Sequence, residues 1–143
     1  MTHLLADTIR IAAAALIGPD RRTLLVRKRG TSSFMQPGGK IDAGEAPLAA
    51  LRRELEEELG LTIDAGSAEY LGCFSAPAAN EAGRKVEAQT FLVEIDAPVE
   101  AQAEIAQLCW LDPFDPPDLE LAPLSRDLIL PLIRARLERH AAG

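Results

Sequence analysis

The chain is poor in aromatic residues, cysteine and histidine. Aromatic side chains make up 4% of its 143 residues, and it contains two cysteines and two histidines. Cys73 and Cys109 do not form a CxxC spacing, which argues against a disulfide scaffold or a cysteine-rich zinc site. We therefore expect both to be free thiols in a reducing compartment. Only a few rings are present that could stack on a ligand.

Long hydrophobic runs are also missing. The apolar run at residues 11–17 is too short to span a bilayer, and no basic segment directly precedes it as in a secretory signal. A buried β-strand explains it better. The sequence thus predicts no membrane partner, no targeting segment and a cytoplasmic location.

Positive charge is in deficit. The 15 Lys and Arg residues stand against 22 Asp and Glu residues, so the net charge is −7. This balance opposes binding to long nucleic acid, which needs a basic surface. An acidic protein that handles phosphate groups would need a bridging cation. Because 48% of the residues are hydrophobic and no linker separates two cores, we expect one globular domain over residues 1–143.

Periodicity and turn residues predict the order of the elements. We expect paired strands at residues 8–17 and 23–29, a glycine-rich turn at 36–40, a helix from Ala46 or Pro47 that ends at Gly60, and a hairpin formed by strands near 69–75 and 86–95. A short helix or turn at 101–108 and a strand at 109–111 should follow. The last helix should span residues 125–140, capped by Ser125, with Pro131 either kinking it or marking its first turn.

The helix at 47–59 carries an unusual group of carboxylates. At about 100° per residue, Glu54, Glu57 and Glu58 share one face beside a leucine stripe. One interpretation is a solvated acidic face that Arg52 and Arg53 neutralise. However, like charges at this spacing repel one another, and the helix dipole disfavours anions near a C-terminus. A nearby glycine turn favours a second interpretation, a site for Mg²⁺ or Mn²⁺ shared with substrate phosphates.

Residues 39–61, GKIDAGEAPLAALRRELEEELGL, resemble the Nudix box. All nine positions specified by Gly-x5-Glu-x7-Arg-Glu-U-x-Glu-Glu-x-Gly-U agree, where U is a bulky aliphatic residue. The expected number of chance matches is on the order of 10⁻⁷. The resemblance implies an α/β fold, an α/β/α sandwich around a mixed sheet. It also implies hydrolysis of a nucleoside diphosphate linked to another group.

The resemblance assigns roles to residues of the box and its flank. It implies that Glu54, Glu57 and Glu58 bind the metal together with the backbone carbonyl of Gly38, and that Arg53 orients these carboxylates. Glu45 could support the loop, bind a metal through water or take part in proton transfer. Lys40 could meet phosphate oxygens.

Residues outside the box supply further candidates. A carboxylate must accept the proton of the attacking water, and Glu104 is a candidate beside Glu45, with Glu100 and Glu81 as weaker ones. Arg27 and Arg29 stand where similar proteins place substrate-binding basic residues, and we favour Arg29 of the two. Strand alternation sends both to one face.

The substrate is less closely defined. The sequence PGGK is typical of MutT-like members, which suggests a nucleoside triphosphate or modified nucleotide cleaved to a monophosphate and pyrophosphate. Pro77, sixteen residues past Leu61, resembles a marker of ADP-ribose pyrophosphatases, although prolines are common in turns. An ADP-ribose or nucleotide-sugar pyrophosphatase, or a nucleotide sensor without catalysis, are the alternatives. A homodimer also stays open.

Overall fold

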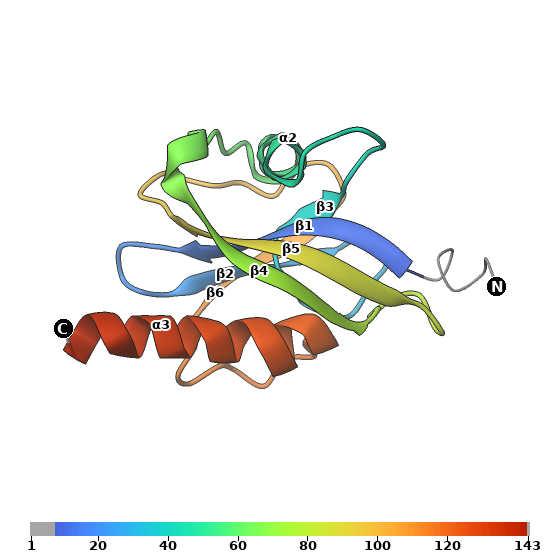
Figure 1. Ribbon diagram of the computed structural model, residues 1–143. Helices are drawn as coiled ribbons and strands as arrows, with labels where there is room; N and C mark the ends of the chain where they lie inside the picture. Colours follow the sequence, from blue (N-terminus) through green and yellow to red (C-terminus); the bar gives the residue numbers. More distant parts are fainter. Residues whose placement is uncertain (1–7, 143) are drawn as a thin grey trace.

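The computed structural model describes residues 8–142, in which a six-stranded mixed sheet lies between two long helices (Figure 1). Helix α2 covers one face and helix α3 the other. The predicted α/β/α sandwich is therefore confirmed. The elements in chain order are β1 (Thr8–Ile17), β2 (Thr23–Lys28), β3 (Gly38–Lys40), α2 (Pro47–Leu59), the 3₁₀ turn η1 (Ala65–Ser67), β4 (Ala68–Pro77), β5 (Lys85–Glu94), β6 (Ile105–Leu111), the π-helical turn η2 (Leu124–Ile129) and α3 (Leu130–Ala142).

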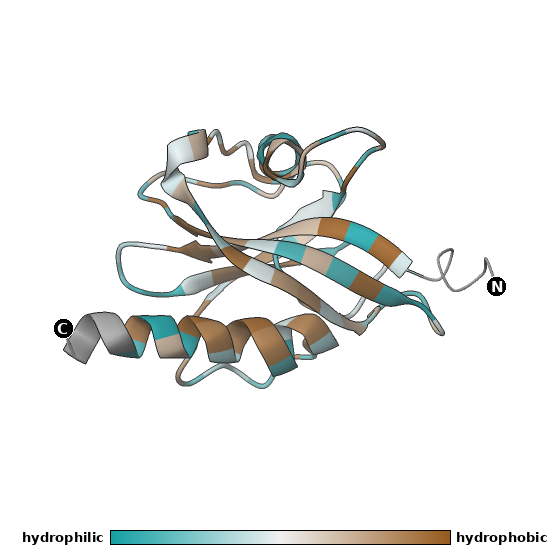
Figure 2. Cartoon of the chain, viewed as in Figure 1, coloured by the Kyte–Doolittle hydropathy of each residue, from teal (hydrophilic) through white to brown (hydrophobic). Residues whose placement is uncertain are grey.

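Strand β1 lies in the centre of the sheet and is buried on both faces. Ala12, Ala14 and Leu16 belong to the core beneath α2, whereas Ala13 and Ala15 belong to the core above α3. This alternation explains why the strand reads as a continuous apolar run. Figure 2 shows the hydrophobic residues gathered along the strands and along α3. No helix of the described residues is long and apolar enough to cross a membrane.

The two N-terminal strands pair less than the sequence suggests. β1 and β2 pair only where they meet, at Ile17 and Thr23, and β1 then runs parallel to β5 over its full length. β3 pairs antiparallel with β1 at residues 11–13. The predicted glycine turn at 36–40 is thus partly a short strand, held in the sheet by β1.

The predicted helix or turn at residues 101–108 is correct only at its start, where a turn at residues 103–104 precedes a strand. Residues from Ile105 onward form β6, which pairs antiparallel with β2 along the whole of that strand. An unpaired edge of β2 would leave backbone groups without partners, and pairing with β6 outweighs the local helical preference of alanine and glutamine. The hairpin of β4 and β5 is confirmed.

The start of the last helix also differs from the prediction. Ser125 makes no capping hydrogen bond; it is fully buried inside η2, where the N–H of Leu130 donates to the carbonyl of Ser125 five residues back. Pro131 lies inside a continuous helical run over residues 123–142, directly after the π-helical turn η2, so it coincides with a distortion of the helix and not with a free helix start.

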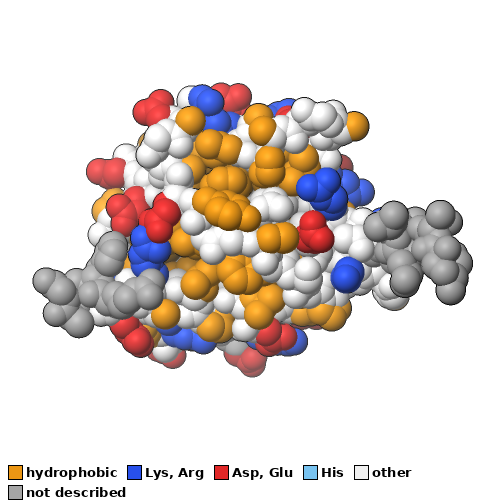
Figure 3. Space-filling view, viewed as in Figure 1, with side chains coloured by type: hydrophobic (Ala, Val, Ile, Leu, Met, Phe, Trp, Pro, Cys, Tyr) orange, Lys and Arg blue, Asp and Glu red, His pale blue; other side chains and the backbone are white. Residues whose placement is uncertain are grey.

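Strand β4 forms an edge of the sheet. Hydrophobic side chains lie across the middle of the molecular face drawn in Figure 3. Tyr70 of β4 is one of the few large hydrophobic residues that are exposed, and its hydroxyl donates to Gln89 on β5. Cys73, also on β4, and Cys109 on β6 are free thiols, as predicted.

Glycine is required at position 38 by both conformation and space. Gly38 has a φ of +142°, and a Cβ there would lie 2.0 Å from the carbonyl oxygen of Ala12 in β1. Gly30 also has positive φ (+77°), but a Cβ there would meet nothing within 4 Å.

Substitution of these two glycines distinguishes the cost of backbone strain alone, at Gly30, from that of strain combined with a steric collision, at Gly38. We expect Gly38→Ala to lower the free energy of unfolding by about 3 kcal/mol or more, because β3 must leave β1. Gly30→Ala should lower it by about 1–2 kcal/mol through backbone strain alone. Urea unfolding of both variants measures the difference, and equal losses would show that β3 does not depend on close contact with β1.

Candidate active site

The three glutamates predicted to share a face of α2 differ in exposure. The side chain of Glu57 is 57% exposed and that of Glu54 16%, whereas Glu58 as a residue is only 5% exposed. Leu51, Leu55 and Leu59 anchor α2 in the core, which turns this acidic face toward β3. The carboxylates therefore run from solvent to the interior along one helix face.

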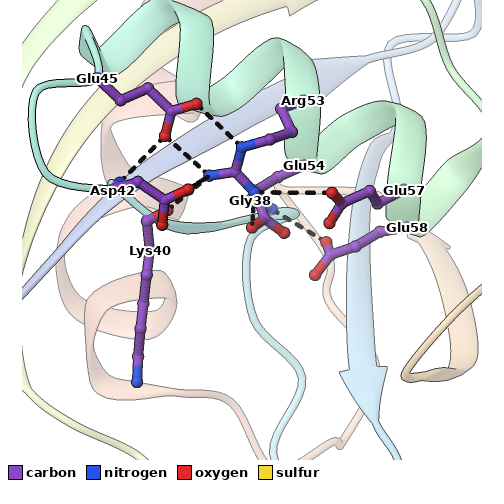
Figure 4. A network of polar contacts seen from close by, with 8 residues as sticks. All are labelled: Gly38, Lys40, Asp42, Glu45, Arg53, Glu54, Glu57 and Glu58. Carbon is purple, nitrogen blue, oxygen red and sulfur yellow. Dashed lines mark hydrogen bonds and ion pairs between the residues drawn. The ribbon is translucent and has the colours of Figure 1, made fainter.

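Arg53 ties this helix face to the loop between β3 and α2 (Figure 4). Its guanidinium donates to both carboxylate oxygens of Glu45 at 2.9 Å, to Glu54 at 2.8 Å and to the backbone carbonyl of Lys40 at 3.1 Å. Asp42 at 3.5 Å and Glu57 at 3.8 Å lie within ion-pair distance. One guanidinium thus fixes both the loop and one carboxylate of the helix, as a planar donor fork can.

Glu45 is held as an anion at the base of the loop. Besides Arg53, it accepts a hydrogen bond from the backbone N–H of Asp42 at 3.0 Å. These two interactions, that with Arg53 first, lower the pKa of Glu45 to about 2, and Glu45 in turn raises the pKa of Arg53.

Glu58 has the opposite environment. Burial, with smaller effects from the charges of Glu54 and Glu104, raises its pKa to about 7, although Lys28 and the N–H of Gly38 oppose the shift. Burial also raises the pKa of Glu54, against the effect of Arg53. Hence two neighbouring carboxylates lie where a full negative charge is costly.

The glycines of β3 permit this arrangement. The N–H of Gly38 donates to Glu58 at 3.3 Å, and a Cβ on Gly39 would lie 2.4 Å from the carboxyl carbon of Glu54. Backbone and carboxylates therefore meet only because no side chain intervenes. Gly38 lies beside Glu58, and the contact between them is made by the Gly38 N–H, whereas the resemblance implies a role for its carbonyl.

The remaining predicted residues spread around this centre. Glu104, exposed on the turn before β6, lies close enough to Glu58 to affect its pKa, and its carbonyl accepts from the N–H of Arg29. Lys40 extends away from the carboxylate network in Figure 4. Arg27 donates to Gln107 and to the carbonyl of Thr31. Arg29 is exposed at the end of β2.

Lys28 is a residue that the sequence analysis missed. It is the last residue of β2 and shares the alternation of Leu24 and Val26, which belong to the core beneath α2. On that face its charge lowers the pKa of Glu54 and of Glu58. Strand alternation was the available signal. It separates Lys28 from its two neighbours but does not say which face holds the acidic helix.

The donor chemistry fits a hard divalent cation. Among residues 8–142, no three Asp, Glu, His or Cys side chains are gathered closely enough to hold an ion as they stand. Yet Glu54 and Glu58 are carboxylates whose negative charge is disfavoured by burial, with Glu57 exposed beside them. A cation such as Mg²⁺ or Mn²⁺ would relieve this cost and prefers oxygen ligands of this kind.

The pKa of Glu45 predicts how stability depends on pH. Because it falls from 4.5 to about 2 on folding, Glu45 stabilises the fold above pH 4.5, and this contribution is lost as the pH falls toward 2. We expect Glu45→Gln to be less stable than the wild type at pH 7, with the difference shrinking below pH 4.5. Urea unfolding between pH 3 and pH 7 measures it. The exposed Glu100→Gln is the control, and a Glu45→Gln deficit independent of pH would contradict the assignment.

Comparison with known proteins agrees with this geometry. The sequence pattern of the NUDIX domain matches residues 7–131. An octanoyltransferase of Myxococcus xanthus is 38% identical over 109 residues, which cover 73% of this chain. An 8-oxo-dGTP diphosphatase of Haemophilus influenzae is 42% identical over 57 residues, or 37% of this chain. The chain spans 30% and 42% of the lengths of these two relatives.

A solved structure agrees over nearly the whole chain. The solution structure of the E. coli ORF135 protein superposes with a TM-score of 0.68 and 27% identity, covering 95% of this chain and 93% of the other. The domain match includes β1 to β6, the helix α2 with its carboxylates and the start of α3. The chain belongs to the NUDIX domain family.

Proposed function

We propose that this protein is a divalent-metal-dependent pyrophosphohydrolase that cleaves the phosphoanhydride bond of a nucleoside diphosphate linked to another group. The observation that carries the proposal is the Arg53 network, which holds Glu54 and Glu57 beside the buried Glu58 at the glycines of β3. Family membership supports the same chemistry. In the reaction, one phosphorus gains a hydroxyl from water and the other phosphate leaves with the bridging oxygen.

Each acidic residue has a proposed role. Glu54, Glu57 and Glu58, with the carbonyl of Gly38, would hold Mg²⁺ or Mn²⁺. When bound, such a cation neutralises charge that develops on phosphate oxygens and activates water. Arg53 orients Glu54 and keeps the loop in place through Glu45. Arg53 is thus a positioning residue.

Glu104 is the better candidate for accepting the proton of the attacking water. Glu45 has a pKa of about 2 and both oxygens bonded to Arg53, so it is a poor base near neutral pH. Glu104 is exposed and lies near Glu58 on the acidic side of the site. Lys28, Lys40 and Arg29 would meet the phosphates of the substrate, whereas Arg27 is tied to Gln107.

The favoured substrate is a nucleoside triphosphate or modified nucleotide, cleaved to the monophosphate and pyrophosphate. The PGGK sequence and the similarity to an 8-oxo-dGTP diphosphatase support it. An ADP-ribose or nucleotide-sugar pyrophosphatase is the second candidate, because Pro77 occupies the position of that marker. A sensor without turnover is disfavoured, since the acidic constellation is intact.

A substrate panel tests the proposal. Canonical and oxidised nucleoside triphosphates, ADP-ribose and nucleotide sugars are incubated with Mg²⁺ or with EDTA, and pyrophosphate and phosphate release is measured. We expect metal-dependent pyrophosphate release from triphosphates. Turnover of ADP-ribose or nucleotide sugars alone would establish the second candidate, and no turnover of any of them would contradict the proposed activity.

Glu57→Gln removes one carboxylate while keeping the shape of the side chain. We expect turnover under saturating Mg²⁺ to fall on the order of 100-fold or more, with little loss of stability because Glu57 is mostly exposed. Glu56→Gln on the same helix is the control, since Glu56 accepts from Thr62 outside the site. Steady-state kinetics and thermal unfolding measure both effects. Wild-type turnover in Glu57→Gln would remove Glu57 from the metal site.

A further inference from the structure

The segment from Glu100 to Glu104 binds the C-terminal end of α2. The N–H of Glu100 donates to the carbonyl of Leu59 at 3.2 Å, and the N–H of Gln102 donates to the carbonyl of Glu58 at 2.9 Å. The last carbonyls of a helix have no partner within the helix, so these hydrogen bonds satisfy groups that α2 leaves unpaired. Glu58, whose side chain belongs to the acidic site, thus also anchors this segment through its backbone.

The side chain of Gln102 makes a second contact with the end of the helix. Gly60, the C-cap of α2, has a φ of +63°, and a Cβ there would lie 2.8 Å from Gln102 Nε2. Glycine at position 60 therefore permits both the left-handed conformation and the close approach of Gln102. The segment is held at this point by a side chain as well as by its backbone.

A strained turn follows directly. Ala103 has a φ of +53°, and Arg21 is the only other non-glycine residue with positive φ among residues 8–142. The N–H of Ile105, the first residue of β6, donates to the carbonyl of Gln102 at 3.0 Å and closes the turn. An alanine in this conformation costs free energy that a glycine would not, and such strained residues cluster at functional sites.

Glu104 is the residue that this turn places. Its carbonyl accepts from the N–H of Arg29, directly after β2, at 2.8 Å, so a second element holds Glu104 on the other side of the turn. Its side chain is exposed and lies close enough to Glu58 to raise the pKa of that carboxyl. Hydrogen bonds to α2 on one side and to the end of β2 on the other thus define where Glu104 lies relative to the carboxylates of α2.

We propose that Ala103 is a positioning residue: its left-handed conformation holds Glu104 beside the carboxylates of α2, and Gln102 ties the turn to the helix that carries them. This inference rests on the proposed hydrolase activity and on the role of Glu104 in it. It adds that the site depends on one backbone conformation outside both α2 and β3.

Substitutions that change the conformational freedom of the turn test this role. Glycine adopts positive φ without strain, whereas a β-branched residue very rarely adopts it. We therefore expect Ala103→Gly to retain kcat within about 2-fold and Ala103→Val to lower kcat about 10-fold or more, with KM changed less than about 2-fold in both. Steady-state kinetics with the triphosphate that the wild type hydrolyses fastest measure both constants. Equal kcat in the wild type and Ala103→Val would overturn the proposal.

Arg21→Val is the matched control for strain and stability. Arg21 has a φ of +66° in the turn between β1 and β2, and it donates to the carbonyl of Leu137 on α3, away from the acidic site. We expect this variant to lower the unfolding temperature at least as much as Ala103→Val, since it also loses that hydrogen bond, but to leave kcat unchanged. An equal loss of kcat in the two variants would show that destabilisation alone explains the effect and would contradict the proposal.

A double-mutant cycle shows whether Ala103 acts through Glu104. We expect Ala103→Val to lower kcat about 10-fold or more in the wild-type background but less than about 2-fold in the Glu104→Gln background, because Glu104 has then already lost its function. The same loss in both backgrounds would assign Ala103 a structural role, and the positioning role would then be wrong.

Amide hydrogen exchange separates this inference from the proposed activity. The N–H groups of Gln102, Ile105 and Arg29 make the contacts of the turn, and we expect them to exchange at least about 10-fold faster in Ala103→Val than in the wild type and Ala103→Gly. If no nucleotide is hydrolysed while this pattern holds, the proposed activity is wrong and the role of the turn in holding Glu104 stands. If nucleotides are hydrolysed but the losses in the cycle are additive, the positioning role is wrong and the hydrolase stands.

Discussion

The close approach of β3 to β1 and α2 is the constraint on which the site depends. Gly38 packs against the carbonyl of Ala12, and Gly39 packs against the carboxyl group of Glu54, with no room for a Cβ in either place. Since β1 is fixed by ten paired positions with β5, the backbone of β3 is held against a rigid central strand. The acidic helix, the glycine backbone of β3 and a cavity that β3 helps to line then meet where β3 pairs with β1.

The electrostatic arrangement follows from that geometry. Arg53 satisfies Glu45 and Glu54 on the solvent side, while Glu58, deeper in the fold, has the weaker N–H of Gly38 and the charge of Lys28. The result is one carboxylate with a strongly lowered pKa and two with raised values within a few residues. The two raised pKa values cost stability at neutral pH, and neighbouring carboxylates with such different pKa values are typical of functional sites. A bound cation would compensate the negative charge of Glu54 and Glu58, which the protein's own positive charges offset only in part.

Sequence reasoning identified the acidic centre because its signal is local. The spacing of Glu54, Glu57 and Glu58 on one helix, with Gly60 in the left-handed conformation as its C-cap, needs no knowledge of the rest of the fold. The sequence did not show that Lys28 faces the site, that residues 105–111 form a strand, or that Ser125 is buried in a π-helical turn. Each of these depends on long-range pairing or packing: β2 with β6, and η2 against the cavity. The roles of the individual glutamates and basic residues stay predictions.

The most direct test of the metal site is binding of Mn²⁺ by the metal-free protein, followed by electron paramagnetic resonance. We expect the wild type and Glu56→Gln to bind Mn²⁺ and Glu57→Gln to bind it at least about 10-fold more weakly. Mn²⁺ affinity that is equal in all three proteins, or absent from the wild type, would contradict the claim that the carboxylate face of α2 is a metal site.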